Sequence, residues 1–231
     1  MIKSSSKSEA NRQNGKYQVD EQRLSILDAA EKLFLLNGLK NTKMVDIAAR
    51  AGITKVTLYR YFPNRDVIAL EIQARMMEKI ASLLDPKDLE PSLEGAKILA
   101  QSMIRNFDLL RDPYRYMGMF DELYLDNPHD EASAQWTKNQ LISMPWSRTA
   151  SLDIMREHPQ GNRFLMVIST VIWFLEKLAL RGELTWSDQT VPLKEHLKLF
   201  EEMILGYIDR FINPATESLQ LEYKKNNTEN A

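Results

Sequence analysis

The spacing of apolar residues predicts helices along nearly the whole chain. From position 26 onward one apolar face recurs at helical spacing, formed by Ile26, Leu27, Ala30, Leu33 and Phe34. Gly38 is placed to end this helix. No stretch of useful length shows the strict alternation of a β-strand. The pattern therefore predicts an all-α protein.

Short helices follow the first one. Thr42 is placed to cap a helix that contains Ile47 and Ala48 and is ended by Gly52. Thr54 is placed to cap the next helix, which contains Leu58 and leads to a fourth that starts near Asn64. Two short helices joined by a tight turn need a residue that tolerates positive φ, and Gly52 supplies it. The spacing predicts a helix-turn-helix.

The remaining chain also has a helical pattern. Candidate helices cover residues 93–111, 114–126, 130–157, 162–181 and 192–212. We expect residues 1–20 to form a flexible basic arm and residues 21–66 a helix-turn-helix domain. Residues 67–215 are expected to form a C-terminal all-helical domain, and residues 216–231 a polar tail.

Composition excludes several classes of protein. With 44% apolar and 27% charged residues, the chain resembles a soluble globular protein. It has no cysteine, which excludes disulfides, thiolate-bound metals and cysteine nucleophiles. The most apolar stretch, residues 164–175, is about half of the roughly 20 residues that cross a bilayer. No signal peptide is evident, so we expect a cytoplasmic protein with no membrane partner.

Charge is distributed unevenly between the two ends of the chain. Residues 1–65 contain twelve Lys and Arg against six Asp and Glu, although the whole chain has a net charge of −2. A basic N-terminal segment attracts phosphates, and an acidic remainder discourages indiscriminate binding. This distribution favours a nucleic-acid partner for the N-terminal segment.

The third helix, which Thr54 is placed to cap, presents a polar face suited to DNA. Once Leu58 and Phe62 point inward, the side chains that remain outside carry hydroxyl groups, positive charge and one branched apolar group: Lys55, Val56, Thr57, Tyr59, Arg60 and Tyr61. Hydroxyls donate to phosphate oxygens, and the apolar side chain suits a thymine methyl. Thr42 and Arg65 stand at the starts of the second and fourth helices, where free backbone amides also favour phosphate.

Two motifs carry a family resemblance. Ile26 to Gly38 reads ILDAAEKLFLLNG, and Ile47 to Arg65 reads IAARAGITKVTLYRYFPNR. Together they resemble the signature of the TetR family of bacterial transcriptional regulators, over roughly the first third of the chain. The resemblance implies a three-helix, homeodomain-like helix-turn-helix domain, followed by a C-terminal helical domain that binds a ligand and dimerises.

The resemblance also assigns roles to residues of the N-terminal domain. It implies that the helix from Thr54 to Tyr61 enters the major groove. Phosphate-contacting positions correspond to Thr42, Thr57, Tyr59, Tyr61 and Arg65, and base-contacting positions to Val45, Lys55, Val56 and Arg60. Many members have glycine where this chain has Val56, so the operator sequence does not transfer.

The resemblance further implies a dimer built from the last two long helices. The last helix has a seam with alternating spacing of four and three, and the segment 164–180 is apolar nearly all round. The expected interface residues are Val171, Leu175, Leu197, Phe200, Ile204 and Ile208. The alternative is a helix that is fully buried within a monomer.

Aromatic residues and methionines concentrate between positions 103 and 146. Such side chains suit an apolar or aromatic small-molecule effector, although many of them serve only as core. The candidate pocket residues are Met103, Phe107, Phe120, Tyr124, Trp136 and Trp146. His129, His158 and His196 have no metal-ligand spacing, so we expect no metal, cofactor or catalytic residue.

These patterns together predict a ligand-responsive DNA-binding regulator. We expect a repressor that a small molecule releases from a palindromic operator in double-stranded DNA. One alternative is a TetR-like factor that binds DNA without an effector. A second is an all-α enzyme, but the sequence contains no nucleotide-binding glycine loop, metal motif or nucleophile constellation.

Overall fold

The computed structural model describes residues 5–83, 93–126, 161–181, 185–186 and 189–212. Within these ranges the regular elements are helices, apart from one pair of two-residue strands. The expected all-α class is confirmed. The chain divides into two compact units, Met1–Arg75 and Met76–Ala231. None of the described helices is both long enough and apolar enough to cross a membrane.

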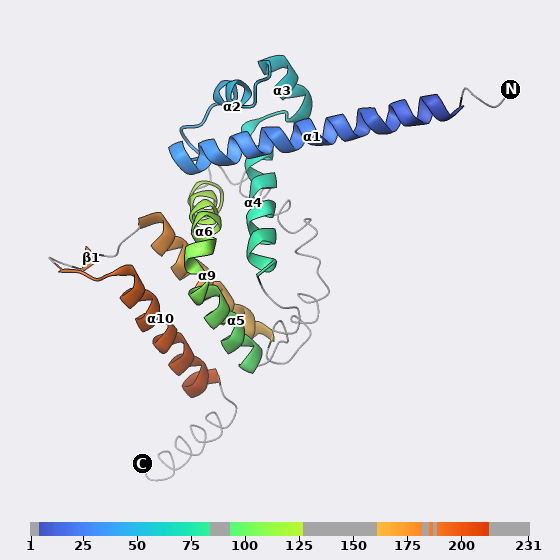
Figure 1. The fold of residues 1–231 in the computed structure, drawn as a ribbon. Helices are drawn as coiled ribbons and strands as arrows, with labels where there is room; N and C mark the ends of the chain where they lie inside the picture. Colours follow the sequence, from blue (N-terminus) through green and yellow to red (C-terminus); the bar gives the residue numbers. More distant parts are fainter. Residues whose placement is uncertain (1–4, 84–92, 127–160, 182–184, 187–188, 213–231) are drawn as a thin grey trace, which may run out of the picture. The chain divides into compact units, whose positions relative to one another are not determined.

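The first unit contains α1 (Ser5–Asn37), α2 (Met44–Arg50), α3 (Lys55–Tyr61) and the beginning of α4 (Arg65–Ala81). Helix α2 packs on α1, and α3 packs on α2 (Figure 1). The core consists of side chains with no exposed surface, among them Ile26, Phe34, Ile47, Leu58 and Phe62. These apolar positions are the ones that the helical spacing predicts.

Two glycines end the helices where the sequence indicates. Gly38 has φ of 82° and follows the last residue of α1, and Gly52 has φ of 67° in the turn between α2 and α3. Both values lie in the left-handed region, which residues with a Cβ rarely adopt. The expected helix-turn-helix geometry is therefore present.

Helix α1 begins earlier than the apolar pattern indicates. It starts at Ser5, whereas we expected order to begin near Glu21 after a flexible arm. Residues 5–20 have no apolar face, and they contain no proline that would break a helix. Hydrophobic periodicity cannot detect a helical segment that is polar all round.

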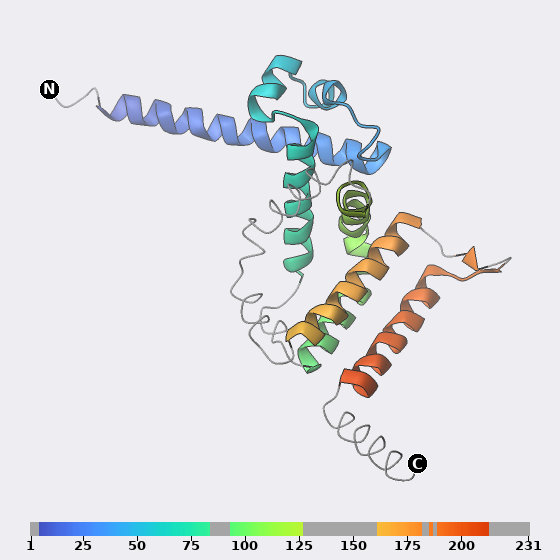
Figure 2. The same ribbon diagram turned by 180° about the vertical axis from the view of Figure 1, so that it is seen from behind.

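The second unit contains the end of α4, α5 (Leu93–Arg105), α6 (Phe107–Asp121), α9 (Gly161–Arg181) and α10 (Leu193–Tyr207). The two C-terminal helices of the described chain run antiparallel (Figure 2), with the Phe174 and Phe200 rings stacked at 3.7 Å. Helix α9 also packs on α5 and α6. Arg105 of α5 pairs with Glu201 of α10 at 2.9 Å, and Lys97 pairs with Asp209.

Three shorter elements complete the second unit. Single π-helical turns follow α6 and α10, at Glu122–Asp126 and Ile208–Ile212. Strands β1 (Thr185–Trp186) and β2 (Gln189–Thr190) pair antiparallel between α9 and α10. The sequence pattern did not predict these strands, because two residues are too few to show an alternation.

The break between α5 and α6 lies at Asn106 and not near residues 112–113 as expected. Pro113 stands inside α6, where it removes a single backbone hydrogen bond. The side-chain amide of Asn106 donates to the Ser102 carbonyl over 2.8 Å and so competes with the helical backbone. The expected helix over 130–157 lies outside the described residues.

Candidate nucleic-acid interface

Helix α3 is fixed at both ends. At its start the Thr57 backbone N–H donates to the Thr54 hydroxyl over 3.1 Å, which makes Thr54 the N-cap as expected. On its inner side Leu58 has no exposed surface, and neither has Phe62 directly after the helix. The outer face of α3 therefore has one defined orientation in this unit.

The outer face carries the side chains that the sequence places there. Lys55, Val56, Tyr59 and Arg60 are exposed, Val56 by 75% and Tyr59 by 44%. The Lys55 ammonium lies 5.7 Å from the centre of the Tyr59 ring, close enough for a cation–π contact. Thr54 and Val45 are also exposed, and Thr57 and Tyr61 are half-buried. Cationic, hydroxyl and apolar groups thus share one accessible surface.

Thr42 is not available to a phosphate. It is 1% exposed, and its hydroxyl donates to the Gly38 carbonyl at 2.9 Å and lies 3.3 Å from the Leu33 carbonyl. The expectation that it contacts DNA and caps α2 is wrong, because its hydroxyl satisfies carbonyls at the end of α1. The N-cap of α2 is Lys43, whose backbone N–H donates to the Asp46 carboxylate over 3.2 Å.

Arg65 is also engaged within the unit. Its guanidinium donates to the carbonyls of Leu39 and Lys40 over 3.0 and 3.2 Å and lies 3.6 Å from the Asp66 carboxylate. The Arg65 side chain remains 27% exposed, and its expected phosphate contact stays a prediction. Its position at the start of α4 is the expected one, and the carbonyls after α1 fix the orientation of its guanidinium.

Arg23 supports the position of α3, a role that the sequence pattern does not predict. It donates to the Tyr61 carbonyl over 3.1 Å, forms an ion pair with Glu71, and lies 4.3 Å over the Phe62 ring. It thereby connects α1 to the end of α3 and to α4. The sequence offers one signal for this role: Arg23 stands three residues before the buried Ile26, so both side chains lie on the same face of α1.

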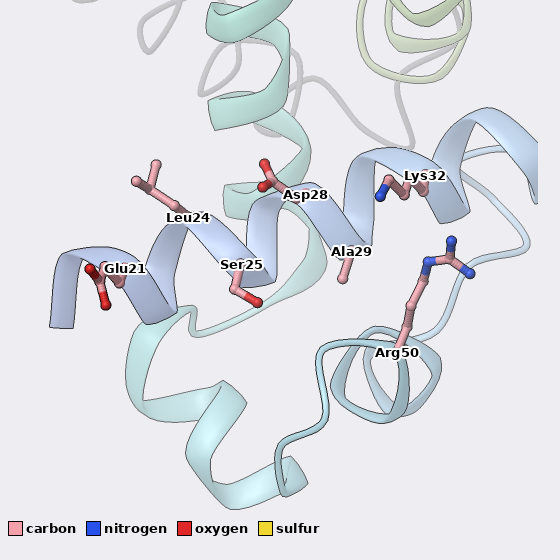
Figure 3. Close-up of a pocket in the computed structure, with 7 residues that line it drawn as sticks. All are labelled: Glu21, Leu24, Ser25, Asp28, Ala29, Lys32 and Arg50. Atoms are coloured by element: carbon pink, nitrogen blue, oxygen red, sulfur yellow. The ribbon is translucent and has the colours of Figure 1, made fainter. Parts of the chain in front are cut away.

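A hollow of about 680 Å³ lies beside α1 (Figure 3). Its lining consists of Glu21, Leu24, Ser25, Asp28, Ala29 and Lys32 from α1 and Arg50 from α2. The lining combines two acidic with two basic side chains, and Asp28 pairs with Arg75 at 2.7 Å. This balanced charge suits a polyanion less well than the outer face of α3.

Comparison with known proteins agrees with this geometry. Residues 26–72 match the family described as bacterial regulatory proteins, tetR family, and this range contains the whole helix-turn-helix. The helix-turn-helix of this chain is that of the TetR family. Its N-terminal unit is the DNA-binding unit of such a regulator, and the expected family is confirmed.

Relatives of this TetR-family chain are transcriptional regulators by name. The activator FasR from Mycolicibacterium smegmatis is 26% identical over 54% of this chain and 57% of its own length. MftR from Mycobacterium tuberculosis, a regulator named for mycofactocin biosynthesis, is 25% identical over 80% of this chain and 90% of its own length. The alignment with FasR thus spans little more than half of that relative.

A crystal structure of a TetR-family regulator from Mesorhizobium loti shares the fold. It is 17% identical, has a TM-score of 0.53, and aligns over 82% of this chain and 96% of its own. At this level of identity the likeness concerns architecture alone. It agrees with an N-terminal helix-turn-helix followed by a helical domain.

The predicted pocket residues of this TetR-family chain lie on α5, on α6 and in the turn after α6, as far as they are described. Met103, Phe107 and Phe120 are each 1% exposed, and Tyr124 is half-buried. The Phe120 and Tyr124 ring centres are 4.6 Å apart. Trp136 and Trp146 lie outside the described residues. The assignment of these six residues to a ligand pocket stays a prediction.

The residues expected at the dimer interface belong mostly to the core of one subunit. Five of them are 4% exposed or less, namely Val171, Leu175, Phe200, Ile204 and Ile208, and Leu197 is half-buried. Side chains that their own domain covers so fully are not available to a partner. A helix that is apolar on nearly every side does not indicate which face its own domain covers. The assignment of Leu197 to the interface stays a prediction. The exposed apolar side chains of these helices are Met166, Trp173, Leu199, Met203 and Tyr207.

Where α6 packs on α9, Glu176 is buried and Asp121 is half-buried. Burial raises the pKa of Glu176 to about 8, and the nearby carboxylate of Asp121 adds to this effect. Burial likewise raises the pKa of Asp121 to about 6, with a further contribution from Asp126. Burial and the charge of Glu176 also raise the pKa of the Tyr114 phenol. Glu176 is thus largely protonated at neutral pH.

We expect Arg23→Met to destabilise the protein by about 1–3 kcal/mol, because it removes a hydrogen bond to Tyr61, an ion pair and a cation–π contact. Urea unfolding measures this loss. Lys32→Met, at an exposed position of the same helix, serves as the control and should change stability by less than about 0.5 kcal/mol. Equal unfolding midpoints for Arg23→Met and the parent would contradict the role of Arg23.

We expect Glu176→Gln to alter how stability depends on pH. The folded-state pKa of Glu176 lies above its ordinary value of 4.5, so the parent loses stability as pH rises from that value through about 8. The variant should lose less stability over this window and exceed the parent by at least about 1 kcal/mol at pH 8. Urea unfolding at several pH values measures both effects.

Asp112→Asn, at an exposed position of α6, serves as the control and should retain the pH dependence of stability of the parent. The same pH dependence in Glu176→Gln would refute the prediction.

Proposed function

We propose that this protein is a ligand-responsive transcriptional regulator that binds a palindromic operator as a homodimer and represses the adjacent promoter. The supporting observation is the outer face of α3, where Lys55, Tyr59 and Arg60 are exposed while Leu58 anchors the helix in the core. A short helix held in this way suits insertion into the major groove of DNA.

Individual side chains of α3 are proposed to act in different ways. Lys55 and Arg60 supply charge to phosphates or base edges, and Tyr59 supplies a phenolic hydroxyl to phosphate. Val56, which is 75% exposed, supplies an apolar contact for a thymine methyl. Thr42 contributes indirectly, by holding the chain between α1 and α2, and Arg65 is proposed to contact a phosphate from the start of α4.

The dimer is proposed to form through the exposed apolar side chains of α9 and α10. Trp173 is 59% exposed and Met203 is 60% exposed, which is unusual for such large apolar groups unless a partner covers them. Gly206 lies on the same helix as Met203 and has open space around its Cα, so a second helix can approach closely there. Two subunits related by a two-fold axis would present two copies of α3 to a palindrome.

The effector is proposed to act by changing the separation of the two DNA-binding units in the dimer. Half-sites are about 34–36 Å apart, so a change of a few ångströms lowers affinity. A ligand achieves this only by binding the released form more tightly than the DNA-bound form.

The names of the relatives and two alternative functions indicate which experiments this proposal needs. FasR is named as an activator, so transcription in vitro with and without the protein must decide the sign of regulation. A factor that binds DNA without an effector is the main alternative, and an unchanged DNA affinity across a ligand library would favour it. The names of the relatives favour a regulator over an enzyme.

For the DNA contacts, we expect Lys55→Ala and Arg60→Ala each to lower the slope of log affinity against log salt by about one. Tyr59→Phe should weaken binding with the slope unchanged, because it removes a hydroxyl and no charge. Fluorescence anisotropy with a duplex selected from random sequences measures both. Lys32→Ala removes a charge from the hollow beside α1 and should behave as the parent. Parental binding by Arg60→Ala and Tyr59→Phe would refute the assignment of α3 as the reading helix.

For the dimer, we expect Trp173→Glu and Met203→Glu to produce monomers at micromolar concentration, because each buries an unpaired charge in the interface. Light scattering coupled to size exclusion measures the mass. Leu109→Glu, at a position of α6 that is 73% exposed, should remain dimeric. A monomeric parent, or dimeric glutamate variants, would contradict this interface.

A further inference from the structure

The outer face of α1 carries a ridge of four exposed side chains. Leu24, Asp28, Lys32 and Leu36 are spaced four residues apart, so they lie along one line on the surface of the helix. Leu24 is 52% exposed, Leu36 is 74% exposed, and the Asp28 side chain is 63% exposed. Ala30, on the opposite side of α1, has no exposed surface. The ridge is therefore surface and not core.

The order of side chains along the ridge is self-complementary. It runs from a leucine through an acidic and a basic side chain to a second leucine. An antiparallel second copy of α1, related by a two-fold axis midway between Asp28 and Lys32, would set each side chain against its complement. Leu24 of one copy would meet Leu36 of the other, and Asp28 would meet Lys32, each contact occurring twice. A two-fold contact needs this kind of self-complementary surface.

The Asp28 carboxylate can accept a second partner. Arg75 lies 2.7 Å from one of its two oxygens. An ionised carboxylate accepts several hydrogen bonds, so Lys32 of a second copy can donate to the other oxygen.

The hollow beside α1 extends this pattern of charge. Figure 3 shows Glu21 at one end of the hollow and Lys32 and Arg50 at the other. The lining between them includes the small side chains of Ser25 and Ala29, so the hollow of about 680 Å³ has room for side chains of another helix. An antiparallel copy brings the acidic end of one hollow to the basic end of the other. Opposite charges then face each other, which favours this arrangement over a parallel one.

We propose that the ridge and the hollow bind the same surface of a second dimer, so that two dimers bind neighbouring operators cooperatively. This inference rests on the proposed function and deepens it, since it adds a form of regulation to DNA binding. The contact involves few side chains, and contacts of small area are weak between molecules in solution. Two operators on one DNA molecule raise the effective concentration of the second dimer, so the contact acts there. On a single operator the ridge has no second copy to bind, which is why Lys32→Ala should behave as the parent there.

The test uses duplexes that contain one or two copies of the selected operator, with the distance between the two copies varied over one helical turn of about 10 base pairs. A mobility-shift measurement resolves the complexes with one and with two dimers. At a favoured distance, we expect the second parental dimer to bind at least about tenfold more tightly than the first. Lys32→Glu makes the centre of both ridges acidic, so repulsion between like charges should abolish this gain.

Lys194→Glu makes the same change of charge at an exposed position of α10 and should retain the gain of the parent. Binding of the single-operator duplex by Lys32→Glu would show that this variant is folded. Equal affinity of both parental dimers at every distance, or a full gain in Lys32→Glu, would overturn the inference. Failure of the parent to bind the single-operator duplex would instead refute the proposed function.

Crosslinking tests the antiparallel register without any change of charge. The chain has no cysteine, so each introduced thiol reports one position. A short bismaleimide should join subunits in a mixture of Leu24→Cys and Leu36→Cys dimers on the two-operator duplex. It should join neither variant alone, because the thiols of one variant would lie at opposite ends of the contact. A mixture without crosslinks, or equal crosslinking of one variant by itself, would contradict the proposed contact.

Discussion

The structure of the N-terminal unit depends on the packing of α1 against two helices that are too short to be stable alone. Helices α2 and α3 have seven residues each, well below the length at which an isolated helix persists in water. They are stabilised by the buried side chains of α1, among them Ile26 and Phe34. The orientation of the DNA-binding face is therefore a consequence of core packing and not of local helix propensity.

Hydrogen bonds from polar side chains fix how these helices pack. Thr42 and Arg65 satisfy carbonyls at and after the end of α1, and Arg23 holds the end of α3 through the Tyr61 carbonyl. These hydrogen-bond donors bind carbonyls inside the unit, while Lys55 and Arg60 are exposed. The unit thus separates basic and hydroxyl side chains into those that support the helices and those that face outward.

The sequence predicted the N-terminal fold well because its signals are local. The two glycine turns, the Thr54 cap and the buried face of α1 each follow from the identity of a few neighbouring residues. It failed where the partner is distant in the chain. Arg65 and Leu39 are far apart in sequence, so no local pattern shows that the guanidinium binds this carbonyl. The buried faces of α9 and α10 were misassigned for the same reason, since apolar side chains such as Val171 and Trp173 occur on several sides of one helix.

The turns at Gly38 and Gly52 have open space around them, since a Cβ at either position would meet no atom within 4 Å. A substitution at either glycine is therefore opposed by the positive φ angle and not by lack of space for a side chain. Alanine and tryptophan should incur a similar backbone penalty of about 1–2 kcal/mol, and asparagine, which tolerates the left-handed region, a smaller one. The residues that these two positions tolerate are accordingly set by the backbone dihedral angle and not by the size of the side chain.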